Sequence, residues 1–203
     1  RYYNIVKDRH KIIKYIAKKN KPVMLATGAS SMEDVERAVS ALQAITKDIV
    51  LMQCNTNYTG EVENFKYINL NVLSAFKRKF PGIVLGLSDH TIGASVVLAA
   101  VALGARVFEK HFTDDNGRDG PDHKFAMNPI TWRAMVDGAN EVYLALGDGT
   151  KRVEENEKQA AIVQRRSIRV NKNMKAGDII TEKDLEVLRP IPQDGFPPYM
   201  LHE

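Results

Sequence analysis

Two histidines stand at matching places in the chain, each close after a run of apolar residues. His90 lies in the segment 88–91 (SDHT), and His111 lies in the segment 109–113 (EKHFT). Neutral imidazole is a common ligand of manganese, iron, cobalt and zinc. If the two runs are parallel strands, their ends meet at one rim, as in the active site of a βα barrel. The spacing therefore predicts a divalent metal site, whereas two hydrogen-bonded structural histidines are the alternative.

Three more polar side chains belong to the same two segments. Side chains two residues apart in a strand point to the same face, so Glu109 faces the same way as His111, and Ser88 the same way as His90. Asp89 faces the opposite way, and we expect it to support the site from behind or to cap a helix. A carboxylate inside a barrel needs a metal or a functional partner to offset its desolvation, although a salt bridge is the structural alternative for Glu109.

Two loops offer further polar groups. Asn57 and Tyr58 follow a third apolar run and carry amide and hydroxyl groups that suit a phosphate or a carboxylate, although both residue types are also frequent in turns. The segment 120–123 (GPDH) follows the strand that leads to His111. Glycine and proline favour a fixed turn there, which can aim Asp122 back at the site; a plain surface turn is the alternative.

These side chains require a scaffold of alternating strands and helices. Apolar runs predict buried strands at 23–26, 49–53, 83–87 and 106–112, and helical periodicity predicts helices at 11–19, from 31 to about 42, within 68–80, at about 94–103 and at about 129–146. Strands that are apolar throughout and alternate with helices indicate a parallel sheet. Four such units make either an open α/β sheet or half of an eightfold barrel, which typically takes about 250 residues.

The composition changes after residue 147. Residues 148–165 are charged and poor in large apolar side chains, which predicts a linker. Beyond it, the pattern predicts a short strand at 166–170, a capped helical turn at 181–185 and a strand-like piece ending at 188–190. So short a segment has too little core to be stable alone, and we expect it to be incomplete or docked on a partner.

Charge and cysteine content narrow the class of protein. The chain has 203 residues, a net charge of +4 and one cysteine, so no disulfide forms within it and a cytoplasmic location is expected. No apolar run approaches the roughly 18 residues that span a bilayer, and the basic residues are scattered among acidic ones. We therefore expect neither membrane nor nucleic acid as a partner, whereas an anionic small substrate suits the balance.

Several linked motifs, in this order, resemble the sialic acid (N-acetylneuraminate) synthase family, which includes legionaminic and pseudaminic acid synthases. They are 27–28 (TG), Cys54 with 57–58 (NY), 86–91 (GLSDHT), 100–105 (AVALGA), 109–113 and 120–123. The segments 166–168 (RSI), 175–177 (KAG) and 188–190 (LRP) resemble the antifreeze-like (SAF) domain of the same family. The resemblance implies an α/β fold: the C-terminal half of a TIM (β/α)8 barrel over residues 1–147, a linker over 148–165, and a partial antifreeze-like β-clip domain over 166–203.

The resemblance also implies a reaction and a role for each candidate residue. Phosphoenolpyruvate condenses with an N-acetylhexosamine such as N-acetylmannosamine, and a divalent metal, in this family usually manganese, assists. Matched by position, His90 and His111 hold the metal, Ser88 and Asn57 contact phosphoenolpyruvate, and Glu109, Tyr58 and Asp122 orient the sugar and the water. Arg189 matches an arginine that enters the partner subunit's site, which implies a domain-swapped homodimer.

The family's barrel begins before Arg1, and its early strands supply a glutamate and a lysine that this sequence lacks. We therefore expect this chain by itself to be unable to turn over. Two other functions remain open. Other enzymes that condense phosphoenolpyruvate with an aldose share the chemistry and the barrel, but the appendage argues against them. A fragment that serves as a non-catalytic assembly module is the second alternative.

Overall fold

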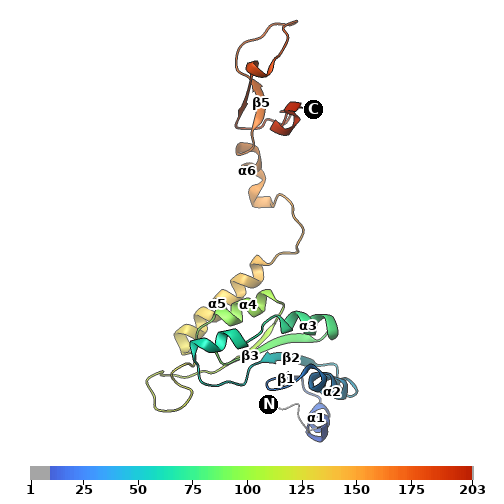
Figure 1. Cartoon of the computed structure of the whole chain (residues 1–203), viewed down its shortest axis with the longest axis vertical. Helices are drawn as coiled ribbons and strands as arrows, with labels where there is room; N and C mark the ends of the chain where they lie inside the picture. Colours follow the sequence, from blue (N-terminus) through green and yellow to red (C-terminus); the bar gives the residue numbers. More distant parts are fainter. Residues whose placement is uncertain (1–9, 203) are drawn as a thin grey trace. The chain divides into compact units, whose positions relative to one another are not determined.

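The computed structural model describes residues 10–202, which fall into two compact units that divide between Asp148 and Gly149 (Figure 1). The larger unit alternates strands and helices. Its elements are α1 (His10–Ala17), β1 (Val23–Ala26), α2 (Met32–Gln43), β2 (Ile49–Cys54), the 3₁₀ helix η1 (Val62–Tyr67), α3 (Val72–Lys79), β3 (Val84–Asp89), α4 (Ser95–Ala102), β4 (Val107–Lys110) and α5 (Pro129–Ala145). None of the helices described is both long and apolar enough to cross a membrane.

The four strands form one curled parallel sheet in the order β1-β2-β3-β4. Each strand pairs in parallel with the next strand along the chain. The helix between two strands therefore returns the chain to the edge of the sheet at which the strands begin, as in βαβ units. This is the architecture of half a (β/α)8 barrel. The prediction of a parallel sheet covered by helices is confirmed, and the carboxyl ends of all four strands share one rim.

The two faces of the sheet are covered differently. Leu25, Leu51 and Leu87 point toward the helices and belong to the main core, which buries apolar side chains of α1 to α5. The opposite face carries a small cluster around Met52, and Val84 there remains 45% exposed. The helix side therefore supplies most of the burial, while the concave side, which carries the candidate site residues, is partly open.

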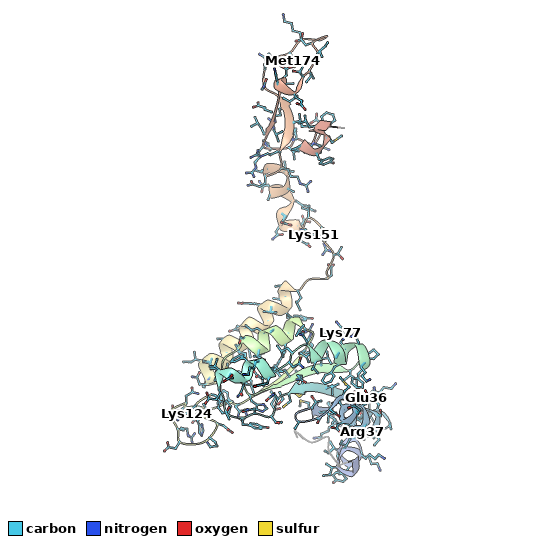
Figure 2. All side chains as sticks on the ribbon, viewed as in Figure 1. Glu36, Arg37, Lys77, Lys124, Lys151 and Met174 are labelled. Atoms are coloured by element: carbon cyan, nitrogen blue, oxygen red, sulfur yellow. The ribbon has the colours of Figure 1, made fainter. Side chains whose placement is uncertain are left out.

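Local sequence signals set the ends of two helices. The Ser31 side chain accepts the Asp34 N–H while the Asp34 carboxylate accepts the Ser31 N–H, a capping box that begins α2. Asn128 caps α5 in the same reciprocal way with Thr131, and Pro129 occupies the first helical position. Glu36 of α2, labelled in Figure 2, forms an ion pair with Lys79 of α3 and links the two helices.

Gly86 lies in the middle of β3, where the strands approach closely. A Cβ atom at this position would lie 2.8 Å from the carbonyl oxygen of Val107 and 2.9 Å from the Met52 side chain. Glycine is therefore required here because the Val107 backbone and the Met52 side chain approach closely, and not because of an unusual φ angle. Because Gly86 has no side chain, β3 and β4 can pair beside Met52.

The helix predicted within 68–80 is confirmed as α3, which begins at Val72. The apolar spacing extends back to Leu70, before the helix, because Ile68 ends the 3₁₀ helix and Asn69 adopts a left-handed conformation with φ 50°, which asparagine tolerates better than most residues. One predicted strand differs from the structure. The fourth strand was predicted at 106–112 but ends at Lys110; Phe112 instead forms an isolated bridge with Met127.

The smaller unit contains an antiparallel pair of strands. Its elements are η2 (Glu155–Glu157), α6 (Lys158–Val163), β5 (Ser167–Val170), η3 (Glu182–Asp184), β6 (Leu185–Leu188) and η4 (Pro198–His202), with β5 paired to β6. The expected linker at 148–165 is thus only partly irregular. Its helix α6 is tied to the smaller unit, because the Ile191 N–H donates to the Ile162 carbonyl over 3.2 Å.

The capped helical turn predicted at 181–185 is confirmed. Thr181 and Asp184 form a capping box, and Lys172 makes an ion pair with the same carboxylate. The hydrogen bonds from Lys172 and Thr181 lower the pKa of Asp184 to about 2. This carboxylate therefore stays charged in the folded unit and fixes the entry into β6.

Candidate active site at the strand ends

His90 directly follows β3, and its ring is held by the neighbouring strand end. Its Nδ1 lies 2.8 Å from the carbonyl oxygen of Asn55, and the side chain is almost buried. Because a carbonyl oxygen only accepts hydrogen bonds, Nδ1 carries the proton and Nε2 keeps a lone pair. Burial, opposed by this hydrogen bond, lowers the pKa of His90 and favours the neutral ring. The residue is thus prepared to act as a nitrogen ligand.

His111 lies next to His90 at the end of β4. The two ring centroids are 5.1 Å apart, and His111 Nδ1 is 3.3 Å from a carboxylate oxygen of Asp122. A carboxylate beside Nδ1 favours the same tautomer as in His90, again with the lone pair on Nε2. The sequence predicted that these three residues would meet, and the structure brings them together.

The two rings together suit a divalent cation as a pair of nitrogen donors, because the Nδ1 of His90 is hydrogen-bonded to Asn55 and the Nδ1 of His111 lies beside the Asp122 carboxylate. Over residues 10–202, no group of three or more His, Cys, Asp or Glu side chains is arranged to hold a metal ion. The described residues therefore offer two protein ligands at most. The remaining coordination positions would fall to water, substrate or ligands from elsewhere.

Aromatic rings enclose the two histidines. The Tyr58 ring lies edge-on to both, with centroid distances of 4.2 Å to His90 and 5.7 Å to His111, and the Phe125 ring lies 5.1 Å from that of His111. Gly60, with φ 68°, packs directly against Phe125, so the loop after β2 rests on the loop after β4. These contacts position Tyr58 over the site even though 42% of its surface is exposed.

The concave face below the histidines carries Cys54, Ser88 and Glu109 side by side. Cys54 pairs with Ser88, and Ser88 pairs with Glu109, in the register of the three strands. Ser88 is 2% exposed, and among the described residues its hydroxyl interacts only with the Cys54 thiol, which is a weak hydrogen-bond partner. A buried hydroxyl without a strong hydrogen bond is unfavourable, so a substrate oxygen is a natural partner for it. Burial raises the pKa of the Cys54 thiol, so the thiol stays protonated and unreactive and only lines the site.

The loop that carries Asp122 is fixed by its own hydrogen bonds; Lys124 marks it in Figure 2. Thr113 Oγ1 lies 2.7 Å from His123 Nδ1, and Asn116 donates its side-chain amide to the carbonyls of His123 and Ala126 over 2.8 and 2.9 Å. The expectation of a fixed turn that aims Asp122 at the site agrees with this geometry.

Two other predicted residues are placed less directly. The side-chain oxygen of Asn57 accepts hydrogen bonds from Thr59 and Asn64, so it shapes the loop after β2, and only its amide N–H groups remain for a ligand. Arg189 lies exposed after β6 in the smaller unit. The roles predicted for Asn57 and Arg189 stay predictions.

Sequence reasoning missed two contacts that hold the site. The backbone carbonyl of Asn55 orients His90, and Lys110 forms a buried ion pair with Asp89. No sequence signal marks a carbonyl oxygen. The sequence did contain a signal for the ion pair of Lys110. A lysine that points from a strand toward the helices needs an anionic partner, and Asp89 was expected on the same face of the sheet.

Residues 6–151 match the model of the NeuB family. The chain belongs to this family. Among curated relatives, the N,N'-diacetyllegionaminic acid synthase of Campylobacter jejuni is 36% identical over 88% of this chain, and human N-acetylneuraminate-9-phosphate synthase is 31% identical over 90%. These alignments cover 53% and 50% of the relatives, so the chain spans about half their length.

A solved structure agrees with the same assignment. The spore coat polysaccharide biosynthesis protein SpsE of Bacillus subtilis superposes with a TM-score of 0.65 at 30% identity, over 98% of this chain and 59% of that one. The family resemblance noted from the motifs is therefore confirmed, together with the half-barrel fold.

Proposed function

We propose that this chain is part of a nonulosonic acid synthase, which condenses phosphoenolpyruvate with an N-acetylhexosamine such as N-acetylmannosamine. The observation that carries the proposal is the meeting of His90 and His111, both with Nδ1 engaged, in a chain of the NeuB family. Synthases of sialic and legionaminic acids are the named activities of its relatives.

The proposed cofactor is a divalent metal, with manganese as our first choice, held through Nε2 of His90 and His111. Such an ion supplies Lewis-acid polarisation of the sugar's aldehyde oxygen. The carbonyl of Asn55 and the carboxylate of Asp122 hold the rings in the tautomer that leaves Nε2 free. Imidazole ligands suit manganese as well as zinc or iron, so the choice of metal rests on the resemblance.

The remaining side chains act on the substrates. Carbon 3 of phosphoenolpyruvate forms a bond to the aldehyde carbon, water adds at carbon 2, and phosphate leaves as the carbon–oxygen bond breaks. Ser88 donates its hydroxyl to phosphoenolpyruvate, with Asn57 as a second donor. Glu109 and Asp122 hold the water and sugar hydroxyls and move protons, and Tyr58 covers the sugar.

An assay of the intact protein tests this function and separates it from its alternatives. Phosphoenolpyruvate and manganese are supplied with either N-acetylmannosamine or arabinose 5-phosphate, and phosphate release is followed together with the sugar acid formed. We expect phosphate and a nonulosonic acid with the N-acetylated sugar only. Turnover with arabinose 5-phosphate alone would identify a different aldose-condensing enzyme, and none with either would favour an assembly module.

For the smaller unit we propose the role of an antifreeze-like domain that delivers Arg189 to the substrate's N-acetyl group in the partner subunit of a swapped homodimer. A guanidinium group can fork two N–H donors onto a carbonyl oxygen. The irregular stretch between α5 and η2 supplies chain for such an exchange. We also propose the cytoplasm as location, since a chain with a single cysteine forms no internal disulfide.

Mixing two inactive variants of the intact protein tests the exchange. Arg189→Ala keeps the barrel site but lacks the arginine, and His90→Ala keeps the arginine but lacks a metal ligand. In a mixed dimer one site combines an intact barrel with an intact arginine, so activity should return toward about one quarter of the wild-type value for random exchange. Subunit exchange is verified by mass spectrometry; exchange without activity would assign Arg189 to its own subunit or to no catalytic role.

A further inference from the structure

A buried ion pair lies directly behind the two histidines. The Lys110 ammonium is 2.7 Å from a carboxylate oxygen of Asp89, and the two side chains are 1% and 0% exposed. Both point toward the helix side of the sheet, opposite to the concave face that carries the candidate site. They therefore touch neither the proposed metal position nor the proposed substrates.

The position of the pair in the sheet relates it to the site. Asp89 and Lys110 are cross-strand partners and the final pair of the β3–β4 register. His90 directly follows Asp89, and His111 directly follows Lys110. Each histidine is bonded through the backbone to one member of the pair, so a change in the spacing or twist of the pair would also move both rings.

The hydrogen bonds of the pair extend past His90. The other carboxylate oxygen of Asp89 accepts the Thr91 N–H over 3.0 Å and the Thr91 hydroxyl over 2.9 Å, and Lys110 donates to the Thr91 carbonyl. The backbone on both sides of His90 is thus tied to β4. Among residues 10–202, no side chain of the concave face takes part in these hydrogen bonds.

Stability alone is a weak reason for such a pair. Removing two charges from water costs about as much as their attraction returns, and well-packed apolar replacements are often as stable or more stable. A buried pair with defined partners does, however, fix one arrangement of the groups that it joins. A role in holding geometry therefore accounts for this pair better than a role in stability.

We propose that Asp89 and Lys110 are positioning residues, whose ion pair locks the ends of β3 and β4 so that the rings of His90 and His111 keep the separation and orientation needed to bind one cation. The inference rests on the proposed metal site for its functional meaning. The arrangement of the rings is nevertheless a property of the metal-free protein and can be measured there.

The double variant Asp89→Leu/Lys110→Met of the intact protein is the main test, because it removes both charges and leaves neither one buried alone. We expect a melting temperature within a few degrees of wild type or above it, and manganese affinity at least about tenfold lower by calorimetry, the range seen when groups that orient metal ligands are lost. Unchanged affinity in this folded variant would overturn the proposal. If it does not fold, Asp89→Asn/Lys110→Gln replaces it under the same criterion.

A matched control separates positioning from general loosening of the sheet. Leu87 faces the helices two residues before Asp89 and pairs with Phe108. Leu87→Ala creates a cavity on the same face and should lower the melting temperature while manganese affinity stays within about twofold. An equal loss of affinity in Leu87→Ala would show that any weakening of this face suffices, and the proposal would fail.

A readout without metal keeps this inference separate from the proposed function. In protein labelled with ¹⁵N-histidine and free of metal at alkaline pH, NMR should show His90 and His111 each with its proton on Nδ1, and Asp89→Leu/Lys110→Met should give mixed tautomers. If wild type binds no manganese, the metal site is wrong and the ring signals alone decide the positioning role. Identical ring signals in wild type and variant would contradict it.

Discussion

Replacing His111 with alanine is expected to lower the affinity for manganese by about 100-fold or more. Loss of a group that merely orients a metal ligand costs about 10–100-fold, and here one of two protein ligands itself is removed. The rings of His111 and His90 lie at a centroid distance of 5.1 Å, so only one histidine of this pair would remain. Calorimetric titration of the intact protein with manganese gives the affinities of wild type and variant.

The matched control for His111→Ala is Phe112→Ala. Phe112 is the next residue, and its ring packs against Trp132 of α5 instead of facing the site, with centroids 5.6 Å apart. This control removes an aromatic ring from the same strand end and should keep the affinity within about threefold. Equal manganese affinity in folded His111→Ala and wild type would rule out His111 as a ligand.

Replacing Glu109 with glutamine is expected to reduce turnover by about 100-fold to 10,000-fold, the usual effect of losing a positioned acid or base. The Glu109 carboxylate lies on the concave face beside Ser88, close enough to His90 to act on its charge, and makes no hydrogen bond or ion pair with any residue of the described part. Glutamine preserves its shape. The melting temperature should therefore stay within a few degrees of wild type while phosphate release falls.

The control for Glu109→Gln is Glu141→Gln, which makes the same chemical change on the exposed side of α5. It should alter neither turnover nor melting temperature. Normal turnover in Glu109→Gln would assign this carboxylate to structure. A parallel loss of turnover and of folded protein would also assign Glu109 to structure, because the loss of turnover would then follow from the loss of folded protein.

Local patterns were sufficient for most of the fold. The strand predicted at 23–26 is β1 to the residue, and the helix predicted at about 129–146 is α5 with one residue fewer. Apolar runs, periodicity and caps are properties of neighbouring residues, so they survive in a single sequence. The helix predicted within 68–80 is α3, but its apolar spacing did not show that the helix begins only at Val72, after the left-handed conformation of Asn69.

The family could also be recognised from linked motifs, and the family model confirms it. The sequence further predicted that His90 and His111 would meet, because parallel strands end at one rim, and that prediction needed only the alternation of strands and helices. The expectation for Asp122 rested instead on the glycine and proline of its loop, which favour a fixed turn. The identity of the metal and of the sugar stays a proposal, since neither follows from the spacing of residues.

The sequence by itself therefore determined most elements of the larger unit, the family, and the face of the sheet for the strand-end residues Ser88, His90, Glu109 and His111. Only the tertiary structure decided how the histidines are held. The Asn55 carbonyl that orients His90 is 35 residues away in the chain, and Asp89 and Lys110 are 21 residues apart. Such contacts depend on strand register and on the path of loops, which are set by the packing of the whole unit rather than by any local stretch.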